Sequence, residues 1–476
     1  MAQLRRVLDA EPVTTLDAWI ALQGGKGLEL ARSVDPETVL DALGRSGLRG
    51  RGGAGFPTAT KWRAVRDNRS NDLPTTVVIN GAEGEPGSYK DRTILATNPY
   101  RVLEGALIAA QIIGADAVVV AMKDTATDAL ARVRHAITDL ATAGWSAGVS
   151  IDVVTGPGAY LYGEETALLE VIAGREPFPR IAPPWRAGAE ESVPTPALVD
   201  NVETLANIAA IVLEGPEWFR TAGTEESPGT LVVTVSGSVA HAGVAEVEMG
   251  TTLREVIEHI GGGPRGRSVR AVLPGVSNAV LTADQLDTRL TYEDMVAAGS
   301  GLGAGAYLVF DEADDPVAIA QGVSRFLAVE SCGQCTPCKQ DGVEISVALD
   351  RLRRSEPDED DRATIDAKLT TITDGARCYL ATQHQVVVAS ILAAFTPEVQ
   401  AHTDRSADPA EPLLIAEIVS IEGTEIELDM AHAAKQPDWT FAEHDSGSAP
   451  ADRLEQGAHA TVPGPSSAPE QPVDPT

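Results

Sequence analysis

Strand and helix signals alternate through the N-terminal third of the chain, and this alternation constrains the fold more than any other feature. Apolar runs typical of buried strands occupy residues 75–80, 115–122 and 149–156, and segments with helical spacing of apolar residues separate them at 99–114 and 124–144. This order predicts a parallel sheet with right-handed crossovers. We therefore expect an α/β fold with a Rossmann-like parallel sheet.

The chain has 476 residues, too many for one ordinary core, so we expect about two to four domains. A change of composition near residues 224–229 marks a boundary. Strand and capped-helix signals after it indicate a compact module, and a helical pattern follows from residue 315 to about 396. We place the domains at residues 1–225 (with a helical N-terminal segment), 226–312, 313–400 and 401–476.

The chain is strongly acidic, with 69 acidic against 37 basic residues. A net charge of −32 excludes a general nucleic-acid binder and disfavours docking on anionic membranes. It suits attraction of a basic partner, or it only keeps the protein soluble. We see neither a secretory signal nor a membrane span, and expect a cytoplasmic protein that reaches a membrane only through partner subunits.

The last segment, residues 401–476, is more acidic still, with 15 acidic and 3 basic residues. Its end, from Ser446 on, has the Pro/Ser/Ala composition of disorder. Residues 411–430 are more apolar and alternating, so they are predicted to form strands that pack on the body of the protein or on a partner.

The cysteines give the strongest chemical signal. Cys332, Cys335 and Cys338 form a C-x₂-C-x₂-C run, and Cys378 follows 40 residues later. Such a run with a distant fourth cysteine is typical of a [4Fe–4S] cluster. The alternative is tetrahedral zinc, which more often uses two separate C-x₂-C pairs. One cluster exchanges single electrons, so the rest of the chain should hold or bind a second carrier.

The stretch "GLRGRGGAGFP" (47–57) contains G-x-G-x-x-G at Gly50, Gly52 and Gly55. A dinucleotide-binding turn would follow a strand and open a helix directly. Here the preceding segment is helical, Pro57 follows the last glycine, and the first good strand comes only later. We therefore interpret the stretch as a loop that binds some other phosphate, with charge added by Arg49, Arg51 and Lys61.

Three further motifs stand at predicted strand ends, at residues 80–92, 156–172 and 199–205. The carboxyl ends of parallel strands are where α/β sheets bind ligands. Side chains suited to bond a heteroaromatic ring or ribityl hydroxyls are Asn80, Glu83, Asp200 and Asn201. Glu164 and Glu165 also fit a simpler interpretation, in which they complement a helix N-terminus.

Together these motifs resemble a known family. "GLRGRGGAGFPTATKW", "GAEGEPGSYKDR", "GAYLYGEETAL", "DNVETLAN" and "ESCGQCTPC…C" stand in the same order in the flavoprotein subunit of respiratory complex I, and in NAD-reducing hydrogenases and NAD-dependent formate dehydrogenases. The resemblance covers about residues 35–400. It implies an FMN- and NADH-binding Rossmann-like domain, a ubiquitin-like β-grasp module that binds soluble ligands, and a helical bundle with a [4Fe–4S] cluster.

The resemblance also implies roles for individual residues. Matching positions around FMN are Gly50, Gly52, Lys61, Asn80, Glu83, Tyr160, Gly163, Glu164, Asp200, Asn201 and Thr204. Matching positions against NADH are Phe56, Glu85, Glu165 and Trp185, with Glu85 and Glu165 as the catalytic candidates. The matching cluster ligands are Cys332, Cys335, Cys338 and Cys378.

The chain departs from the family pattern at three positions of the expected flavin and NADH sites. Ala82 replaces an aspartate, Ala182 replaces a lysine, and Ala64 replaces a bulky apolar residue. The aromatic residue of the same loop is kept as Trp185, and Arg186 adds a charge there. These changes affect the expected NADH site more than the FMN or cluster sites.

Three functions follow from these observations. The first is an NADH dehydrogenase or diaphorase, in which a hydride passes to FMN and single electrons pass through the cluster to a ferredoxin-like or [2Fe–2S] subunit of a larger complex, or flow in reverse. The second is an FMN and [4Fe–4S] electron carrier that no longer uses NAD(H). The third is a scaffold whose cysteines hold zinc.

Overall fold

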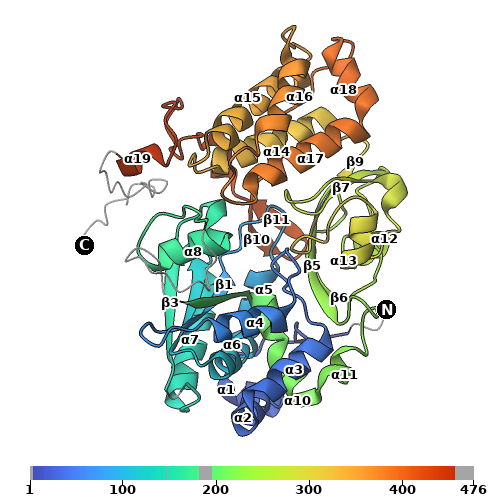
Figure 1. Cartoon of the computed structure of the whole chain (residues 1–476). Coiled ribbons are helices and arrows are strands. Elements are labelled where there is room, and N and C mark those ends of the chain that lie inside the picture. Colours follow the sequence, from blue (N-terminus) through green and yellow to red (C-terminus); the bar gives the residue numbers. More distant parts are fainter. Residues whose placement is uncertain (1–3, 147, 182–195, 456–476) are drawn as a thin grey trace, which may run out of the picture.

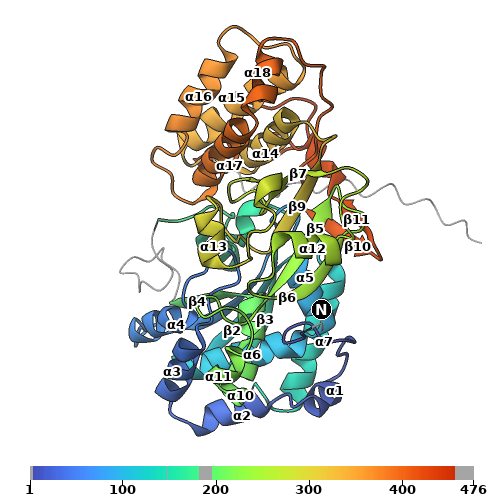
Figure 2. The same cartoon turned by 90° about the vertical axis from the view of Figure 1, so that its right-hand side faces the viewer.

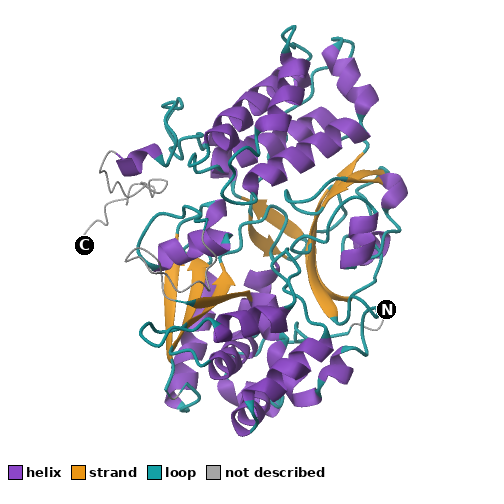
Figure 3. Ribbon diagram, viewed as in Figure 1, coloured by secondary structure: helices purple, strands orange, loops and turns teal. Residues whose placement is uncertain are grey.

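The computed structural model describes residues 4–146, 148–181 and 196–455. They form three units, named here the parallel-sheet unit (16–219), the mixed-sheet unit (230–311) and the helical unit (316–403), followed by a C-terminal strap (404–455). Figure 1 shows the helical unit above the other two, and Figure 3 shows how helices surround the parallel sheet. None of the described helices is long and apolar enough to cross a membrane.

The parallel sheet confirms the predicted alternation of strands and helices. Its order is β3–β2–β1–β4, with all pairings parallel. The strands are β1 (Thr76–Gly81), β2 (Ala117–Lys123), β3 (Ser150–Gly156) and β4 (Ala197–Asn201). The helices after β1 are α5 (Lys90–Thr97) and α6 (Pro99–Ile113), and those after β2 and β3 are α7 (Thr127–Thr142) and α8 (Glu165–Ile172). Short helices surround them: α1 (Leu16–Ala21), α2 (Lys26–Ser33), α3 (Pro36–Ser46), α4 (Thr58–Asp67), α9 (Val202–Ala206), α10 (Ile208–Glu214) and α11 (Pro216–Phe219).

Helices α6 and α9, which lie beside the parallel sheet, pack closely on each other. Gly105 lies in the middle of α6, where a glycine normally weakens a helix. A Cβ at this position would stand 2.0 Å from the Leu205 carbonyl oxygen, so only glycine allows the two helices to approach. The approach brings the start of α9, and with it Asn201 and Thr204, to the carboxyl end of β1.

The mixed-sheet unit has five strands in the order β6–β5–β9–β7–β8. They are β5 (Thr230–Gly237), β6 (Gly243–Glu248), β7 (Val269–Leu273), β8 (Leu281–Thr282) and β9 (Ala306–Asp311). The central pair β5–β9 is parallel and the other pairs are antiparallel. Two helices, α12 (Leu253–His259) and α13 (Tyr292–Ala297), complete the unit, whose core is separate from that of the parallel sheet.

The helical unit carries all four cysteines, as the sequence predicted. Its helices are α14 (Pro316–Glu330), α15 (Thr336–Arg353), α16 (Asp361–Thr371), α17 (Leu380–Ala394) and α18 (Thr396–Thr403). Helix α14 is buried along nearly its whole length and packs on both α15 and α17. The loop between α14 and α15 and the loop before α17 therefore lie side by side at one end of the unit.

The strap forms the two strands expected in residues 411–430, and it packs on the body. They are β10 (Ile418–Glu422) and β11 (Glu425–Leu428), paired as a hairpin. Figure 2 shows the hairpin beside β5, below the helical unit. Glu417 pairs with Lys123 at the end of β2, and Ala242 donates its N–H to the Thr424 carbonyl at 2.9 Å.

The end of the strap differs from the disorder expected from Ser446 onward. Residues 446–455 form turns and the short helix α19 (Asp452–Glu455). The Ala451 N–H donates to the Cys332 carbonyl at 2.9 Å, which anchors this segment on the first cysteine loop. Backbone hydrogen bonding to a buried loop outweighs the local composition here. The remainder of the expected disordered stretch, residues 456–476, lies outside the described residues.

Candidate functional site

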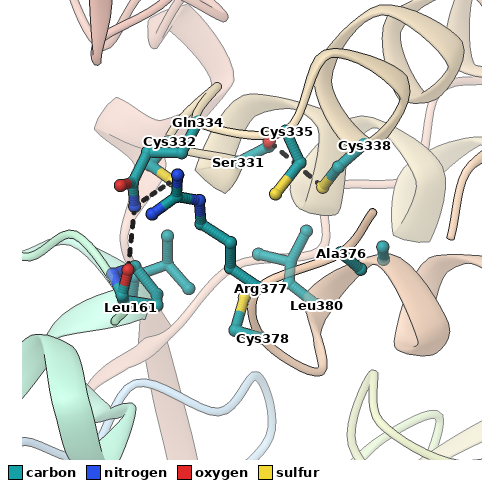
Figure 4. Close-up of a pocket in the computed structure, with 12 residues that line it drawn as sticks. Leu161, Ser331, Cys332, Gln334, Cys335, Cys338, Ala376, Arg377, Cys378 and Leu380 are labelled. Carbon is teal, nitrogen blue, oxygen red and sulfur yellow. Dashed lines mark hydrogen bonds between the residues drawn. The ribbon is translucent and has the colours of Figure 1, made fainter. Parts of the chain in front are cut away.

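The four cysteines line one cavity (Figure 4). Cys332 lies in the loop after α14, Cys335 caps α15, Cys338 lies in its first turn, and Cys378 precedes α17. The other lining residues are Leu161, Pro179, Ser331, Gln334, Ala376, Arg377, Leu380 and Ala381. The structure thus brings together all four residues predicted as metal ligands.

The thiols are held in an environment that disfavours their ionisation. Burial raises the pKa of Cys338 to about 11 and that of Cys378 to about 12, and neighbouring thiols add to the shift. Polar support comes from the Ser331 hydroxyl, 3.3 Å from the Cys338 sulfur, and from the Gln334 amide, 3.5 Å from the Cys332 sulfur. Four clustered thiols of this kind become thiolates when a metal centre supplies positive charge.

These four thiols can be compared with the needs of a cluster and of a single ion. A tetrahedral zinc would draw all four sulfurs to one centre, whereas in a [4Fe–4S] cluster each thiolate binds a different iron. Three equally spaced cysteines, Cys332, Cys335 and Cys338, with the distant Cys378 are the donor set typical of the cluster.

His384, which follows Cys378 by six residues, is a packing residue. Its Nε2 lies 2.8 Å from the Ser324 hydroxyl inside the helical unit, and the side chain is buried. Burial lowers the pKa of His384 to about 3.

The glycine-rich loop lies between two helices, α3, which the sequence indicated, and α4, which it did not. It closes on itself, because the Gly50 N–H donates to the Phe56 carbonyl at 2.8 Å. It is joined to the start of α9, because the Arg51 N–H donates to the Thr204 hydroxyl at 2.8 Å. The first strand, β1, follows only after α4, which confirms that the loop is not a dinucleotide-binding turn.

The N-terminus of α4 is suited to bind an anion. Its N-cap, Pro57, offers no side-chain hydrogen bond, and the buried Thr58 hydroxyl has no partner among the described residues. Lys61 follows one turn later; its ammonium lies 3.0 Å from Glu165 and donates to the Val199 carbonyl at 2.5 Å. The Thr58 N–H already donates to the Leu48 carbonyl at 3.1 Å, so the groups that fit a phosphate here are the rest of the helix start, the unpartnered Thr58 hydroxyl and Lys61.

The two loop arginines do not face this position, contrary to the sequence-based interpretation. Arg51 is buried, and its guanidinium bonds Tyr292 at 3.0 Å. Arg49 donates to the Gly55 carbonyl at 2.7 Å and pairs with Glu293 at 3.0 Å. Both guanidinium groups are therefore bonded to residues away from the start of α4, and Lys61, itself paired with Glu165, is the cation in the first turn of that helix.

Several predicted residues meet at the carboxyl edge of the sheet. The Asn80 amide donates to the Gly163 carbonyl at 2.9 Å, which joins the loops after β1 and β3. Asp200 accepts from the Trp62 indole at 2.7 Å, and burial raises the pKa of Asp200 to about 6. Glu164 caps α8 through the N–H groups of Thr166 and Ala167, so the simpler interpretation of this residue is confirmed.

A buried charge network lies beneath this edge, and no local sequence pattern indicated it. Lys90 is fully buried; its ammonium contacts Asp91 at 2.7 Å, Glu203 at 3.0 Å and the Asn201 amide oxygen at 3.0 Å. Asn201 in turn donates to Asp91 at 2.7 Å. Lys90 and Asp91 fall within the motif 80–92, but nothing near them in the chain identifies their partners more than 100 residues away.

Glu83, predicted to line the flavin, belongs to the adjoining part of that network. Its carboxylate accepts from the Ser88 hydroxyl at 2.5 Å and from the Arg92 guanidinium at 3.1 Å. It also accepts backbone N–H groups at the start of α5. All these contacts join residues of the loop after β1 and the start of α5, so they hold the conformation of that loop.

Glu85 and Tyr160 connect this edge to the cysteine cavity. The Tyr160 hydroxyl donates to Glu85 at 2.6 Å and accepts from the Gln383 amide at 2.9 Å. Gln383 lies on α17, five residues after Cys378. The Tyr160 N–H also donates to Glu330 at 2.9 Å, at the end of α14. Sequence reasoning found neither Gln383 nor Glu330.

Three protein-family models match separate parts of the chain. The model of the Nuo51 FMN-binding domain matches residues 43–210, and that of the SLBB domain matches residues 232–274. The model of the NADH-ubiquinone oxidoreductase-F iron-sulfur binding region matches residues 318–402, which include all four cysteines.

Similar proteins extend these matches along the chain. The NADP-reducing hydrogenase subunit HndC of Solidesulfovibrio fructosivorans is 36% identical over 408 residues, which cover 83% of this chain and 82% of that protein. One NADH-quinone oxidoreductase subunit of Mycobacterium tuberculosis is 35% identical over 412 residues, 83% of this chain and 92% of the relative. The chain belongs to this family of NADH oxidoreductase flavoprotein subunits.

A solved structure agrees with the family assignment. One chain of the NAD⁺-reducing [NiFe]-hydrogenase in the H₂-reduced state is 34% identical, with a TM-score of 0.73. The similarity covers 82% of this chain and 67% of the hydrogenase chain.

Of the two aromatic residues expected against NADH, only one can be placed. Trp185, together with Ala182 and Arg186, lies outside the described residues. Phe56 lies at the end of the glycine loop and is half exposed, with 52% of its surface accessible.

Proposed function

We propose that this chain oxidises NADH at the carboxyl edge of the parallel sheet and passes the electrons singly to a partner protein. FMN, when bound, accepts a hydride from a nicotinamide and can give up its electrons one at a time. The family membership supports FMN and a [4Fe–4S] cluster, and the residues described above fit both groups. NAD(H) as the substrate is our inference from the family and from Glu85 and Glu165.

The observation that carries the proposal is the hydrogen-bond chain from Glu85 through Tyr160 to Gln383. It joins the loop after β1, where the resemblance places the flavin and nicotinamide, to the helix that begins after Cys378. A rigid link of two hydrogen bonds, 2.6 and 2.9 Å long, keeps the two sites in fixed proximity. Fixed proximity is what electron transfer between two bound centres requires.

The chain's own side chains then have distinct tasks. Lys61 and the N-terminus of α4 would hold the FMN phosphate, and Asn80 would face the ring system. Glu165 orients Lys61 through their ion pair. Glu85 accepts hydrogen bonds from Tyr160, from the Val276 N–H at 2.7 Å and from the Ser277 hydroxyl at 3.1 Å.

Burial, and not these contacts, lets Glu85 hold a proton beside the position where the resemblance places the nicotinamide. Burial raises the pKa of Glu85 above its ordinary value, and its three hydrogen-bond donors only partly offset this. A protonated Glu85 would keep the site uncharged while a negatively charged dinucleotide enters.

We infer a ubiquitin-like β-grasp fold for the mixed-sheet unit. The strand order β6–β5–β9–β7–β8, with a parallel central pair and a helix after the first hairpin, supports it. The relatives are named as subunits, so we infer that this chain also works in a complex. Its electron partner would be a ferredoxin-like or [2Fe–2S] subunit.

Anaerobic purification followed by FMN, iron and zinc analysis tests the cofactors. We expect FMN and iron in a ratio of about one to four, and bleaching of the flavin absorbance on addition of NADH. NADPH is the matched control for the choice of nicotinamide. A flavin that dithionite reduces but excess NADH does not would favour the carrier without NAD(H). Zinc in place of both groups would favour the scaffold.

A further inference from the structure

Helix α13 of the mixed-sheet unit packs directly on the glycine-rich loop. Gly55 has φ +61°, and a Cβ there would stand 2.3 Å from the Tyr292 ring. Gly53 has φ +118°, which L side chains rarely adopt, and a Cβ there would make only an ordinary contact, 3.8 Å from the backbone of Gly303 and Ala304. Gly55 is therefore required by contact with another unit, and Gly53 by its own backbone conformation.

Tyr292 makes most of the polar contacts between the two. Its hydroxyl donates to the Gly50 carbonyl at 3.0 Å and accepts from the Arg51 guanidinium at 3.0 Å. The Arg49 guanidinium lies over the ring, 3.8 Å from its centroid, which is a favourable cation–π distance. One side chain thus bonds the loop at three successive positions, Arg49, Gly50 and Arg51.

The neighbouring residue and the buried network complete the attachment. Glu293 pairs with Arg49 at 3.0 Å and accepts from the Ser227 hydroxyl at 2.5 Å. The Glu203 carboxylate accepts the Val232 N–H from β5 at 2.8 Å, and Thr204, on the same helix, accepts the Arg51 N–H. The loop is therefore held between α13 on one side and α9 on the other.

We propose that Tyr292 is a positioning residue for the flavin-phosphate loop, and that the mixed-sheet unit sets the conformation in which this loop binds FMN. The claim that the loop binds FMN rests on the proposed function. The claim that Tyr292 orders the loop does not, because all its contacts are made within the chain.

Two substitutions separate the contributions of Tyr292. Tyr292→Ala removes the ring and both hydrogen bonds, whereas Tyr292→Phe removes only the hydrogen bonds. Two controls belong to the same unit and have no described contact with the loop. Tyr307→Phe removes a buried hydroxyl, and Met295→Ala opens the core beneath α13.

The first readout is the dissociation constant of FMN, measured by flavin fluorescence on protein freed of flavin. We expect Tyr292→Ala to raise this constant about tenfold or more and Tyr292→Phe to raise it about threefold. Both controls should stay within about twofold of the wild type, although Met295→Ala lowers the melting temperature. The reduced cluster's EPR signal should be the same in all variants.

The second readout needs no cofactor. Trypsin cuts after arginine, and the Arg51 side chain is only 1% exposed while Tyr292 holds it. In flavin-free protein, cleavage after Arg49 and Arg51 should be faster in Tyr292→Ala than in the wild type or in Met295→Ala.

The proposal would be overturned if Tyr292→Ala bound FMN and resisted trypsin like the wild type. It would equally be overturned if Met295→Ala matched Tyr292→Ala in both measurements, because the effect would then be general loosening of the unit. A wild-type protein without affinity for FMN would refute the proposed function instead, and the trypsin comparison would still decide the role of Tyr292.

Discussion

The two sites of this protein are built in opposite ways. The cysteine cavity takes all four of its sulfurs from one unit and one short stretch of sequence, residues 332–378. The proposed flavin site takes its residues from several strand ends and a glycine loop, which the mixed-sheet unit contacts. A local site needs only its own residues, whereas a distributed site depends on the packing between units.

The largest effect should come from the local site. Cys378→Ala removes one of four ligands, and we expect loss of the cluster's visible absorbance and EPR signal with FMN still bound. Ser331→Ala, which removes only a contact with the Cys338 sulfur, is the control and should keep the cluster. If Cys378→Ala also released the flavin, the two sites would not be separable in this way.

A second prediction concerns contacts of the cluster loop with the strap. Glu330, two residues before Cys332, is buried and pairs with Lys435 at 2.5 Å and with His432 at 3.1 Å. Lys435→Met leaves this carboxylate without its main partner and should lower the free energy of unfolding by about 3 kcal/mol. Thermal unfolding measures this, and adding Glu330→Gln should restore most of the loss.

The same pair predicts a pH dependence. Burial alone would raise the pKa of Glu330, but Lys435 and His432 outweigh it and hold this pKa below its ordinary value of 4.5. A depressed pKa stabilises the fold above the ordinary value, and this stabilisation is lost as the pH falls below it. The stability gap between wild type and Lys435→Met should therefore shrink between about pH 5 and about pH 3. A constant gap would contradict the assignment.

At the proposed flavin site, replacing a single residue should have a smaller effect than replacing a cysteine of the cluster site. Lys61→Gln removes the cation at the start of α4 and should weaken FMN binding about 10- to 100-fold, the range for a charged hydrogen bond. Lys26→Gln is the control, because Lys26 is exposed and its described ion pair is with Glu29, far from the loop. Flavin fluorescence titration measures both. Unchanged affinity in Lys61→Gln would place the phosphate elsewhere.

The smallest effect tests the link between the two sites. Gln383→Ala removes the hydrogen bond to Tyr160 and leaves both sets of ligands in place. Stopped-flow reduction by NADH should show flavin reduction unchanged and cluster reduction slowed about threefold. If flavin reduction and cluster reduction each had the same rate in the variant as in the wild type, the link would not be needed for electron transfer.

The contrast between the sites also explains what the sequence could reveal. The grouping of the cysteines, the first three strands of the parallel sheet and the helix before the glycine loop were predicted correctly, because each depends on residues close together in the chain. The choice between zinc and the cluster stayed open in the sequence, and the match of residues 318–402 to an iron-sulfur binding region favours the cluster.

The sequence could not identify contacts between residues that are far apart in the chain. Arg51 is a cation beside glycines, so it was assigned to a phosphate; the structure pairs it with Tyr292, 241 residues away. The sequence likewise gives no sign that Lys90 pairs with Glu203, or that Gln383 donates a hydrogen bond to Tyr160. Ile418 falls in the stretch predicted to pack on the body or on a partner, whereas the acidic composition of the rest of the strap concealed Trp439, which is also buried.

The position of the strap has a consequence for how the protein is assembled. The strap leaves the ribosome after residues 1–403, so the cysteine loops and the strand ends are synthesised before Ala451 reaches Cys332 and before Glu417 reaches Lys123. Until then the Cys332 carbonyl lacks the hydrogen bond from Ala451, and Lys123 lacks its carboxylate partner Glu417. The contacts that tie the strap to the helical unit and to the parallel sheet are therefore among the last that the growing chain can form.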